Sequence, residues 1–238
     1  GECWRRAMRS RHVWAEVADK AGIAVEHSGL CVAARRPEAR AVLDAFAATE
    51  MGRECRVLAP QEAVGMVPTL RRDALDAALW SPHELRVESR TAIPKLASWL
   101  KEAHGVTFLR STLAKHVAPP KIETTHGTLY AETAIVCAGD DFKTLFPERI
   151  AAYGLTHCKL HMMRVKPPRT APSLGAAVMS DLGLVRYLGY SELPEAEALR
   201  TRLLAEQESA LDNGVHLIVV QSADGSLVRS ARSSKPSR

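Results

Sequence analysis

The chain has 238 residues, of which 46% are hydrophobic and 25% charged, the balance of an ordinary globular protein with one large domain or two small ones. This composition excludes disorder along the whole chain, and no apolar run reaches the roughly 18 to 20 residues that span a bilayer. The five cysteines form no CxxC pair, so neither a zinc site nor a disulfide framework is expected. No apolar signal segment follows the first residues. The sequence therefore predicts a cytoplasmic protein without a membrane partner.

The net charge of +5 lies at the two ends of the chain. Residues 1–12 contribute +3 and residues 229–238 contribute +4, so the remaining residues carry −2. A nucleic-acid-binding domain needs a basic stripe across its folded face. We therefore expect no nucleic-acid partner.

The first third of the sequence alternates between helical and strand-like patterns. Trp4, Met8 and Val17 recur at helical spacing, and Gly22 closes this first helix. Beyond it, the patterns predict a strand within 23–34, a helix over 37–49, a short strand at 56–58, a helix over 60–67, and a strand that ends at residue 80 before a turn at 81–83.

A further helix is expected from about residue 89 to residue 104, with Gly105 as its stop. Pro94 favours Thr91 over Ser89 as the N-cap, because proline is tolerated only in the first turn. Strands at 106–109 and 113–117 follow, and then a hairpin formed by 122–125 and 128–130.

Residues 133–137 are almost wholly apolar and end at Ala138–Gly139, a pattern typical of a strand buried on both faces of a parallel sheet. Cys137 is then interpreted as a small buried hydrophobe rather than a reactive thiol. Later patterns predict strands at 160–165, 177–179 and 216–220, a helix over 194–210, and a turn at 223–225. Residues 229–238 are expected to form a solvated, disordered tail, because they have too few apolar groups to fold.

Four segments in chain order resemble the D-amino-acid oxidase and glycine oxidase family of FAD-dependent oxidoreductases. They are the helix ending at His104 with the hairpin around His126–Gly127, ETAIVCAGDD (132–141), CKLHMMRV (158–165) and HLIVVQSADGSLV (216–228). Three stretches, WSPHELRVESR, MSDLGLVRYLGY and GVHLIVVQSADGS, are similar to one clade of that family, which is associated with aminophosphonate breakdown.

The resemblance implies a mixed α/β fold in which part of an FAD-binding, Rossmann-like domain is interleaved with a mixed β-sheet substrate domain. It assigns residues 1–22 and 89–147 to the FAD domain, 23–88 and 148–228 to the substrate domain, and 229–238 to the tail. It also implies FAD as cofactor and a small amine as substrate, oxidised by hydride transfer to the flavin. It indicates no oligomeric state.

Two departures from the family pattern concern the cofactor. The family begins with a GxGxxG turn before a helix that binds the FAD diphosphate, and the sequence contains no GxGxxG. The basic tail stands where the family continues into a glycine-containing flavin contact. An inactive fragment of such an enzyme is therefore the first alternative interpretation, and a protein that binds nucleic acid through its basic tail is the second.

The resemblance places several residues at the cofactor. Val117 matches the strand that meets the flavin adenine, and the small-residue turn matches a close backbone approach. Lys159 and His161 share one side of a strand that is expected to face the flavin. The full set is Val117, Cys137, Ala138, Gly139, Lys159, His161, Asp224 and Gly225.

The substrate candidates are Arg186, Tyr187 and Tyr190, because an anionic amine needs a guanidinium group and phenolic donors. Arg86 is a further candidate to line the cleft. The structural alternatives are tyrosines packed on a sheet face and solvated arginines. No catalytic acid or base is expected, since the flavin performs the hydride chemistry.

The residues just before the DG turn also bear on the substrate. Glycine oxidases have an arginine there that holds a carboxylate, whereas this sequence has Gln221 and Ser222. The difference favours an anion other than a plain α-amino-acid carboxylate.

Overall fold

The computed structural model describes residues 1–157 and 160–232. They form two compact units: the larger contains residues 1–99 and the described residues from 160 onward, and the smaller contains residues 100–157. The boundary lies within helix α4 (Ser89–His104). Both units contain β-sheet and helices, which confirms the predicted mixed α/β fold class.

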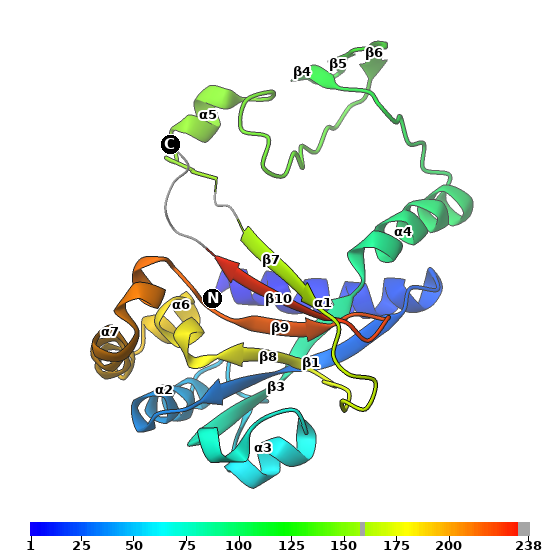
Figure 1. The fold of residues 1–238 in the computed structure, drawn as a ribbon. Helices are drawn as coiled ribbons and strands as arrows, with labels where there is room; N and C mark the ends of the chain where they lie inside the picture. Colours follow the sequence, from blue (N-terminus) through cyan, green and yellow to red (C-terminus); the bar gives the residue numbers. More distant parts are fainter. Residues whose placement is uncertain (158–159, 233–238) are drawn as a thin grey trace. The chain divides into compact units, whose positions relative to one another are not determined.

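The larger unit is built on a seven-stranded sheet in the order β2-β3-β1-β8-β9-β10-β7 (Figure 1). Its strands are β1 (Val25–Ala34), β2 (Arg56–Leu58), β3 (Ala77–Val87), β7 (Leu160–Val165), β8 (Ala177–Ser180), β9 (Ile218–Gln221) and β10 (Leu227–Arg232). Its helices, besides the start of α4, are α1 (Glu2–Lys20), α2 (Pro37–Ala47), α3 (Pro60–Met66), η1 (Arg72–Ala74), η2 (Asp181–Val185), α6 (Leu188–Ser191) and α7 (Ala196–Asp212).

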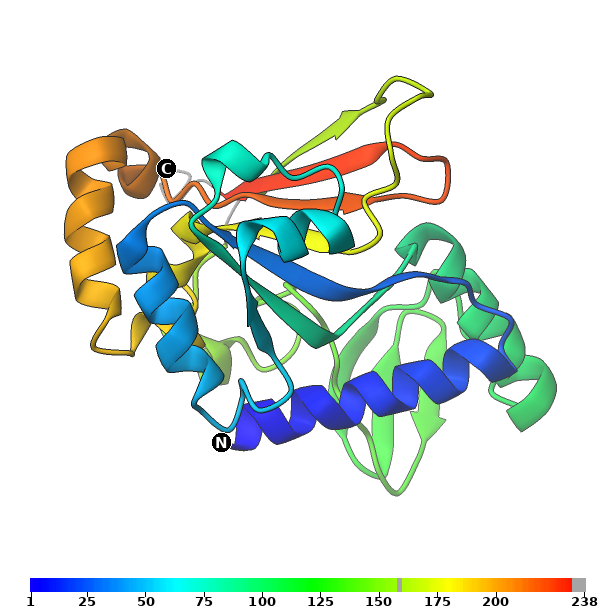
Figure 2. The same ribbon diagram turned by 90° about the horizontal axis from the view of Figure 1, so that it is seen from below.

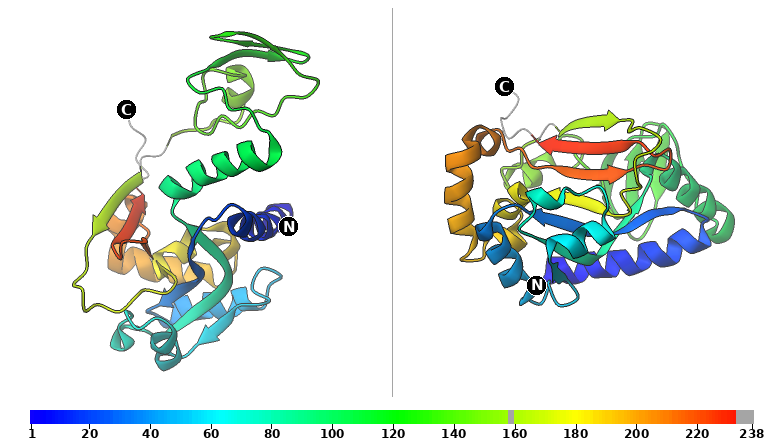
Figure 3. Two further views of the ribbon diagram at one scale, coloured as in Figure 1. Left: turned by 90° about the vertical axis from the view of Figure 1, so that its right-hand side faces the viewer. Right: turned by 60° about the horizontal axis from the view of Figure 1, so that its bottom comes forward.

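The sheet is mixed. Strands β1 and β8 run parallel, and the other neighbouring pairs are antiparallel. Figure 3 shows β7 and β10 running in opposite directions. The strands predicted at 56–58, 160–165 and 177–179 are confirmed to within one residue.

Strand alternation sends apolar side chains to both faces of the sheet. On one face Val32 and Leu79 are fully buried against α2, η2 and α7. On the other face Cys31 and Ala78 are buried with residues of α3. Helices α2 and α7 lie next to each other (Figure 2), so the first face has a continuous helical cover.

A buried ion-pair network joins three helices of this layer, α2, η2 and α7. Arg36 precedes α2, and its Nη1 lies 2.6 Å from Oδ2 of Asp181 at the start of η2. The same guanidinium group lies 2.7 Å from Oε2 of Glu206 on α7. The side chains of Arg36 and Asp181 are only 9% and 3% exposed, so each charge depends on the other for compensation.

The turn predicted at 81–83 is wrong, because β3 continues through these residues to Val87. Strand β2 pairs only with residues 78–80 of β3, and the register with β1 shifts between Ser28 and Leu30. Pro82, which has no N–H to donate, therefore lies where the ladder is interrupted. Gly29 at this bulge has φ +88, and a Cβ there would lie 2.7 Å from the Trp80 ring.

The predicted N-cap of α4 is also wrong. The helix begins at Ser89, and the amide of Ala92 donates to the Glu88 carbonyl at 2.8 Å. Thr91 lies inside the first turn, where its hydroxyl donates to the same carbonyl at 3.1 Å. Pro94 is thus accommodated within the helix at the loss of one backbone hydrogen bond.

The smaller unit contains a three-stranded antiparallel sheet of β4 (Ala114–Ala118), β5 (Lys121–Thr124) and β6 (Gly127–Tyr130), and the short helix α5 (Pro147–Ala151). The predicted hairpin is confirmed. The strands expected at 106–109 and 133–137 are wrong: neither segment is a strand, Ile135 is 85% exposed, and Cys137 is exposed. A strand needs a neighbour for its amide and carbonyl groups, and no described residues pair with these segments.

The predicted tail begins too early. Residues 229–232 belong to β10, which pairs with β9 on one side and β7 on the other. Hydrogen bonding on both sides orders a segment whose composition alone indicates disorder. Residues 233–238 lie outside the described residues. Among the helices described, none is both long enough and apolar enough to cross a bilayer.

Candidate functional site

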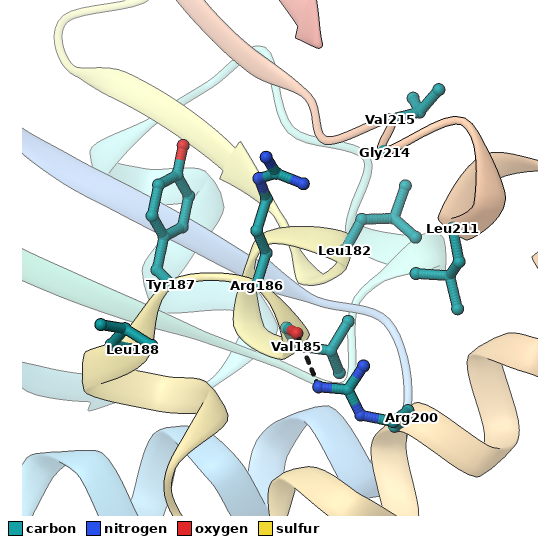
Figure 4. Close-up of a pocket in the computed structure, with 9 residues that line it drawn as sticks. All are labelled: Leu182, Val185, Arg186, Tyr187, Leu188, Arg200, Leu211, Gly214 and Val215. Carbon is teal, nitrogen blue, oxygen red and sulfur yellow. Dashed lines mark hydrogen bonds between the residues drawn. The ribbon is translucent and has the colours of Figure 1, made fainter. Parts of the chain in front are cut away.

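A pocket of about 470 Å³ opens in the larger unit where η2 leads into α6. Arg186 and Tyr187 extend in the same direction from neighbouring positions, and Arg200 reaches the pocket from α7 (Figure 4). Its lining residues are Leu182, Val185, Arg186, Tyr187, Leu188, Arg200, Leu211, Gly214 and Val215. The structure thus brings two of the four predicted substrate residues, Arg186 and Tyr187, to one pocket.

The polar groups of this pocket are held by their surroundings. Arg200 donates to the Val185 carbonyl at 2.9 Å, and the Tyr187 ring meets the His216 ring edge-on with centroids 5.5 Å apart. Two guanidinium groups and a phenol beside aliphatic side chains suit a small molecule with an apolar body and an acidic group.

Tyr190 does not line the pocket. Its ring packs against Phe46 of α2, with centroids 4.3 Å apart, and burial raises the pKa of its hydroxyl. Tyr190 therefore has a packing role, against helix α2 rather than against a face of the sheet.

Arg86 lies in another part of the larger unit. It is on β3, and its Nη2 lies 3.4 Å from the Ser222 hydroxyl and 3.6 Å from the Glu88 carboxylate. Its side chain is 18% exposed, which contradicts a solvated position. The pairing of strands in the sheet thus brings the Arg86 guanidinium group next to Ser222, just before the DG turn.

Asp224 and Gly225 shape the turn between β9 and β10. The amide and hydroxyl of Ser226 donate to Asp224 Oδ1 at 3.0 and 2.6 Å, and Arg164 lies 2.9 Å from Oδ2. These hydrogen bonds, that of the Ser226 hydroxyl first, lower the pKa of Asp224. Gly225 has φ +79, which favours glycine. In this structure both residues support the turn.

The smaller unit brings three predicted cofactor residues together. Val117, Cys137 and Ala138 line a pocket of about 360 Å³ with Ala114, Ile122, Ala134, Ile135, Val136 and Leu145. Gly139 follows with φ +63, and a Cβ there would meet no atom within 4 Å. This lining of small and larger aliphatic side chains fits the face of a planar aromatic ring such as adenine. The side chain of Val117 and the backbone at 138–139 would hold that end of an FAD molecule.

The remaining predicted cofactor residues are separate. His161 is exposed on β7, and Lys159 lies outside the described residues. Among the residues that the structure describes, no group of three or more His, Cys, Asp or Glu side chains is placed to hold a metal ion.

Sequence reasoning missed His27, Arg164 and Arg200. His27 had a detectable signal, because alternation along β1 buries residues 27, 29 and 31 on one side, and a histidine at such a position is unusual. Arg164 and Arg200 had none, because their partners depend on strand and helix pairing.

The sequence matches the family model described as FAD dependent oxidoreductase over residues 1–192. No curated protein is significantly similar to this chain.

Solved structures share its fold. L-proline dehydrogenase from P. horikoshii aligns with a TM-score of 0.67 and 17% identity over 98% of this chain and 56% of that chain. Glycine oxidase from Geobacillus kaustophilus aligns with a TM-score of 0.59 and 17% identity over 98% and 55%. L-alpha-glycerophosphate oxidase from Mycoplasma pneumoniae, determined with FAD bound, aligns with a TM-score of 0.59 and 13% identity over 96% and 56%. The chain thus spans little more than half the length of these proteins, and because the family model covers most of it, it belongs to the family of FAD dependent oxidoreductases.

Proposed function

We propose that the protein takes part in the FAD-dependent oxidation of a small amine or amino acid that carries an acidic group. An aminophosphonate is the substrate class that the clade resemblance favours. The observation that carries the proposal is the pairing of Arg186 and Tyr187 in one pocket of a chain from this family. The structural relatives include a proline dehydrogenase and a glycine oxidase, which supports an amino group in the substrate.

The residues of the pocket would bind and orient rather than exchange protons. The Arg186 guanidinium group offers two parallel N–H donors, a geometry that suits a carboxylate or phosphonate. The Tyr187 hydroxyl adds a donor beside it. Leu182, Leu188 and Val215 would pack on the carbon skeleton and exclude water. When bound, FAD supplies the hydride acceptor.

Gln221 and Ser222 stand where glycine oxidases have an arginine, and the guanidinium group at this place comes from Arg86 instead, so the argument for a substrate other than a glycine-like amino acid rests on the Arg186 pocket. A phosphonate has three oxygen atoms and a higher charge than a carboxylate at neutral pH. A pocket with guanidinium groups on two of its sides, Arg186 and Arg200, can contact more of these oxygens than a single arginine.

The test begins with cofactor retention by the full chain. The purified protein is incubated with FAD and desalted, and its flavin absorbance is measured; we expect retained flavin. Turnover is then measured in excess FAD with an artificial electron acceptor, for a panel of aminophosphonates, α-amino acids and glycerol phosphate. Oxidation of the aminophosphonates first and of amino acids more slowly is the expected result.

Two results would overturn the proposal. A folded protein that stays colourless and inactive in excess FAD would favour the alternative of an inactive fragment. Preferential oxidation of glycerol phosphate would assign the pocket to a hydroxyl substrate.

Arg186→Met should raise the KM for the acidic amine by at least about tenfold, the value of one charged hydrogen bond.

A further inference from the structure

A buried histidine lies near the start of β1. His27 is only 9% exposed, and neither of its ring nitrogens has a hydrogen-bond partner among the residues that the structure describes. An imidazole carries one donor and one acceptor even when neutral. Buried groups of this kind are nearly always hydrogen-bonded in folded proteins, so His27 has unused binding capacity.

The guanidinium group of Arg86 is underused in the same place. Arg86 pairs with His27 across the β1–β3 ladder, and its Nη1 is buried with no partner in the described part of the chain. Its Nη2 makes only long contacts, 3.4 Å to the Ser222 hydroxyl and 3.6 Å to the Glu88 carboxylate, whereas charged N–H···O bonds are usually about 2.7–2.9 Å long. The local cation is therefore only partly compensated.

Arg86 itself lines a different pocket, but a pocket of about 270 Å³ in the larger unit adjoins His27. His27 and Ser222 line it, together with the hydroxyl-bearing Ser173 and the carboxylate-bearing Glu26. Ser222 thus faces the pocket and contacts Arg86. Ser222, Ala223 and Gly225 of this pocket follow β9 in the chain, whereas Gly214 and Val215 of the Arg186 pocket precede β9.

We propose that this second pocket binds an oxyanion, either free phosphate or the phosphonate or carboxylate group of a small molecule. The oxyanion takes hydrogen bonds from His27 and Ser222 and is held by the charge of Arg86, a set of donors that matches a tetrahedral or planar acid group. Glu26 also lines the pocket, and its carboxylate favours a ligand that carries an ammonium group beside its acid group. The proposal does not depend on flavin or on turnover.

Inorganic phosphate is the first probe, titrated into the full chain by isothermal calorimetry. A second titration with aminomethylphosphonate distinguishes the two sources, because tighter binding of the amine would identify the ligand as a zwitterion and equal binding would identify it as the free ion. In parallel, the imidazole 15N signals of His27, assigned with His27→Gln, are followed. Saturable binding that shifts these signals is expected.

Arg86→Met should weaken phosphate binding at least tenfold, because one charged contact is lost. Arg86→Lys, which keeps the charge, should weaken it less and covers the case in which the methionine variant does not fold. Arg71→Met is the matched control, since this arginine is 79% exposed and its ion pair is with nearby Asp73. Absence of binding, equal losses in Arg86→Met and Arg71→Met, or binding that leaves His27 unshifted would each overturn the proposal.

Discussion

Arg36→Met should destabilise the larger unit by about 3–5 kcal/mol, the cost of removing one partner from a buried ion pair. The substitution leaves the Asp181 carboxylate 3% exposed, with the Arg35 amide at 3.3 Å as its remaining described donor. Asp181→Asn should cost less, roughly 1–3 kcal/mol, because Arg36 keeps its contact with Glu206 at 2.7 Å. The order of the two effects follows from which charge loses its compensation.

Urea unfolding followed by tryptophan fluorescence measures both effects. The four tryptophans Trp4, Trp14, Trp80 and Trp99 all belong to the larger unit, so the signal reports on the unit that contains the network. Arg71→Met, at an exposed ion pair, serves as the control and should leave the midpoint unchanged. If Arg36→Met lowers the midpoint no more than this control, or less than Asp181→Asn, the network does not stabilise the fold in the way described.

Three further predictions concern single side chains. Burial, and then the Arg86 charge, lower the pKa of His27 from 6.5, so below that pH the unfolded chain binds more protons than the folded chain and stability falls as the pH falls. His27→Gln should flatten this part of a pH series of urea midpoints. An unchanged slope would mean that another group causes the pH dependence. Burial raises the pKa of Glu84, and its Oε2 is buried with no partner among the described residues, so the folded state disfavours the ionised carboxylate. Glu84→Gln should therefore raise the urea midpoint at pH 7, and a lower midpoint would contradict this. Tyr187→Phe should reduce kcat/KM for the acidic amine roughly 2- to 10-fold, whereas Tyr190→Phe should not, and equal losses in steady-state assays would refute the division between them.

Local patterns predicted most of the larger unit, because strand alternation and helix spacing act over a few residues. They failed where pairing decides the outcome. Residues 133–137 have a strand's composition without a strand's neighbours, and residues 229–232 have a tail's composition with a neighbour on each side. Pro82 indicated a turn, but a bulge opposite Gly29 keeps it within β3.

The same limit applies to the candidate sites. Arg186 and Tyr187 are adjacent in sequence, so their common pocket could be anticipated. Arg86 and Ser222 are 136 positions apart, and their contact depends on the order of β3, β1, β8 and β9 in the sheet. The cation near the DG turn could not be found by looking for an arginine in the turn itself.

The two pockets lie at opposite ends of β9, which has a bonded strand on each side and so forms a rigid support for the residues that flank it. Its four residues span about 13 Å, so one acid group cannot contact Arg186 and Arg86 at once. Substitutions at such separations usually act independently. In calorimetric titrations with an aminophosphonate, Arg186→Met should therefore weaken binding at one site and leave the other unchanged, Arg86→Met should do the reverse, and the double variant should weaken both. If either substitution alone weakened binding at both sites, the two arginines would bind the same ligand and the two sites would have to be treated as one.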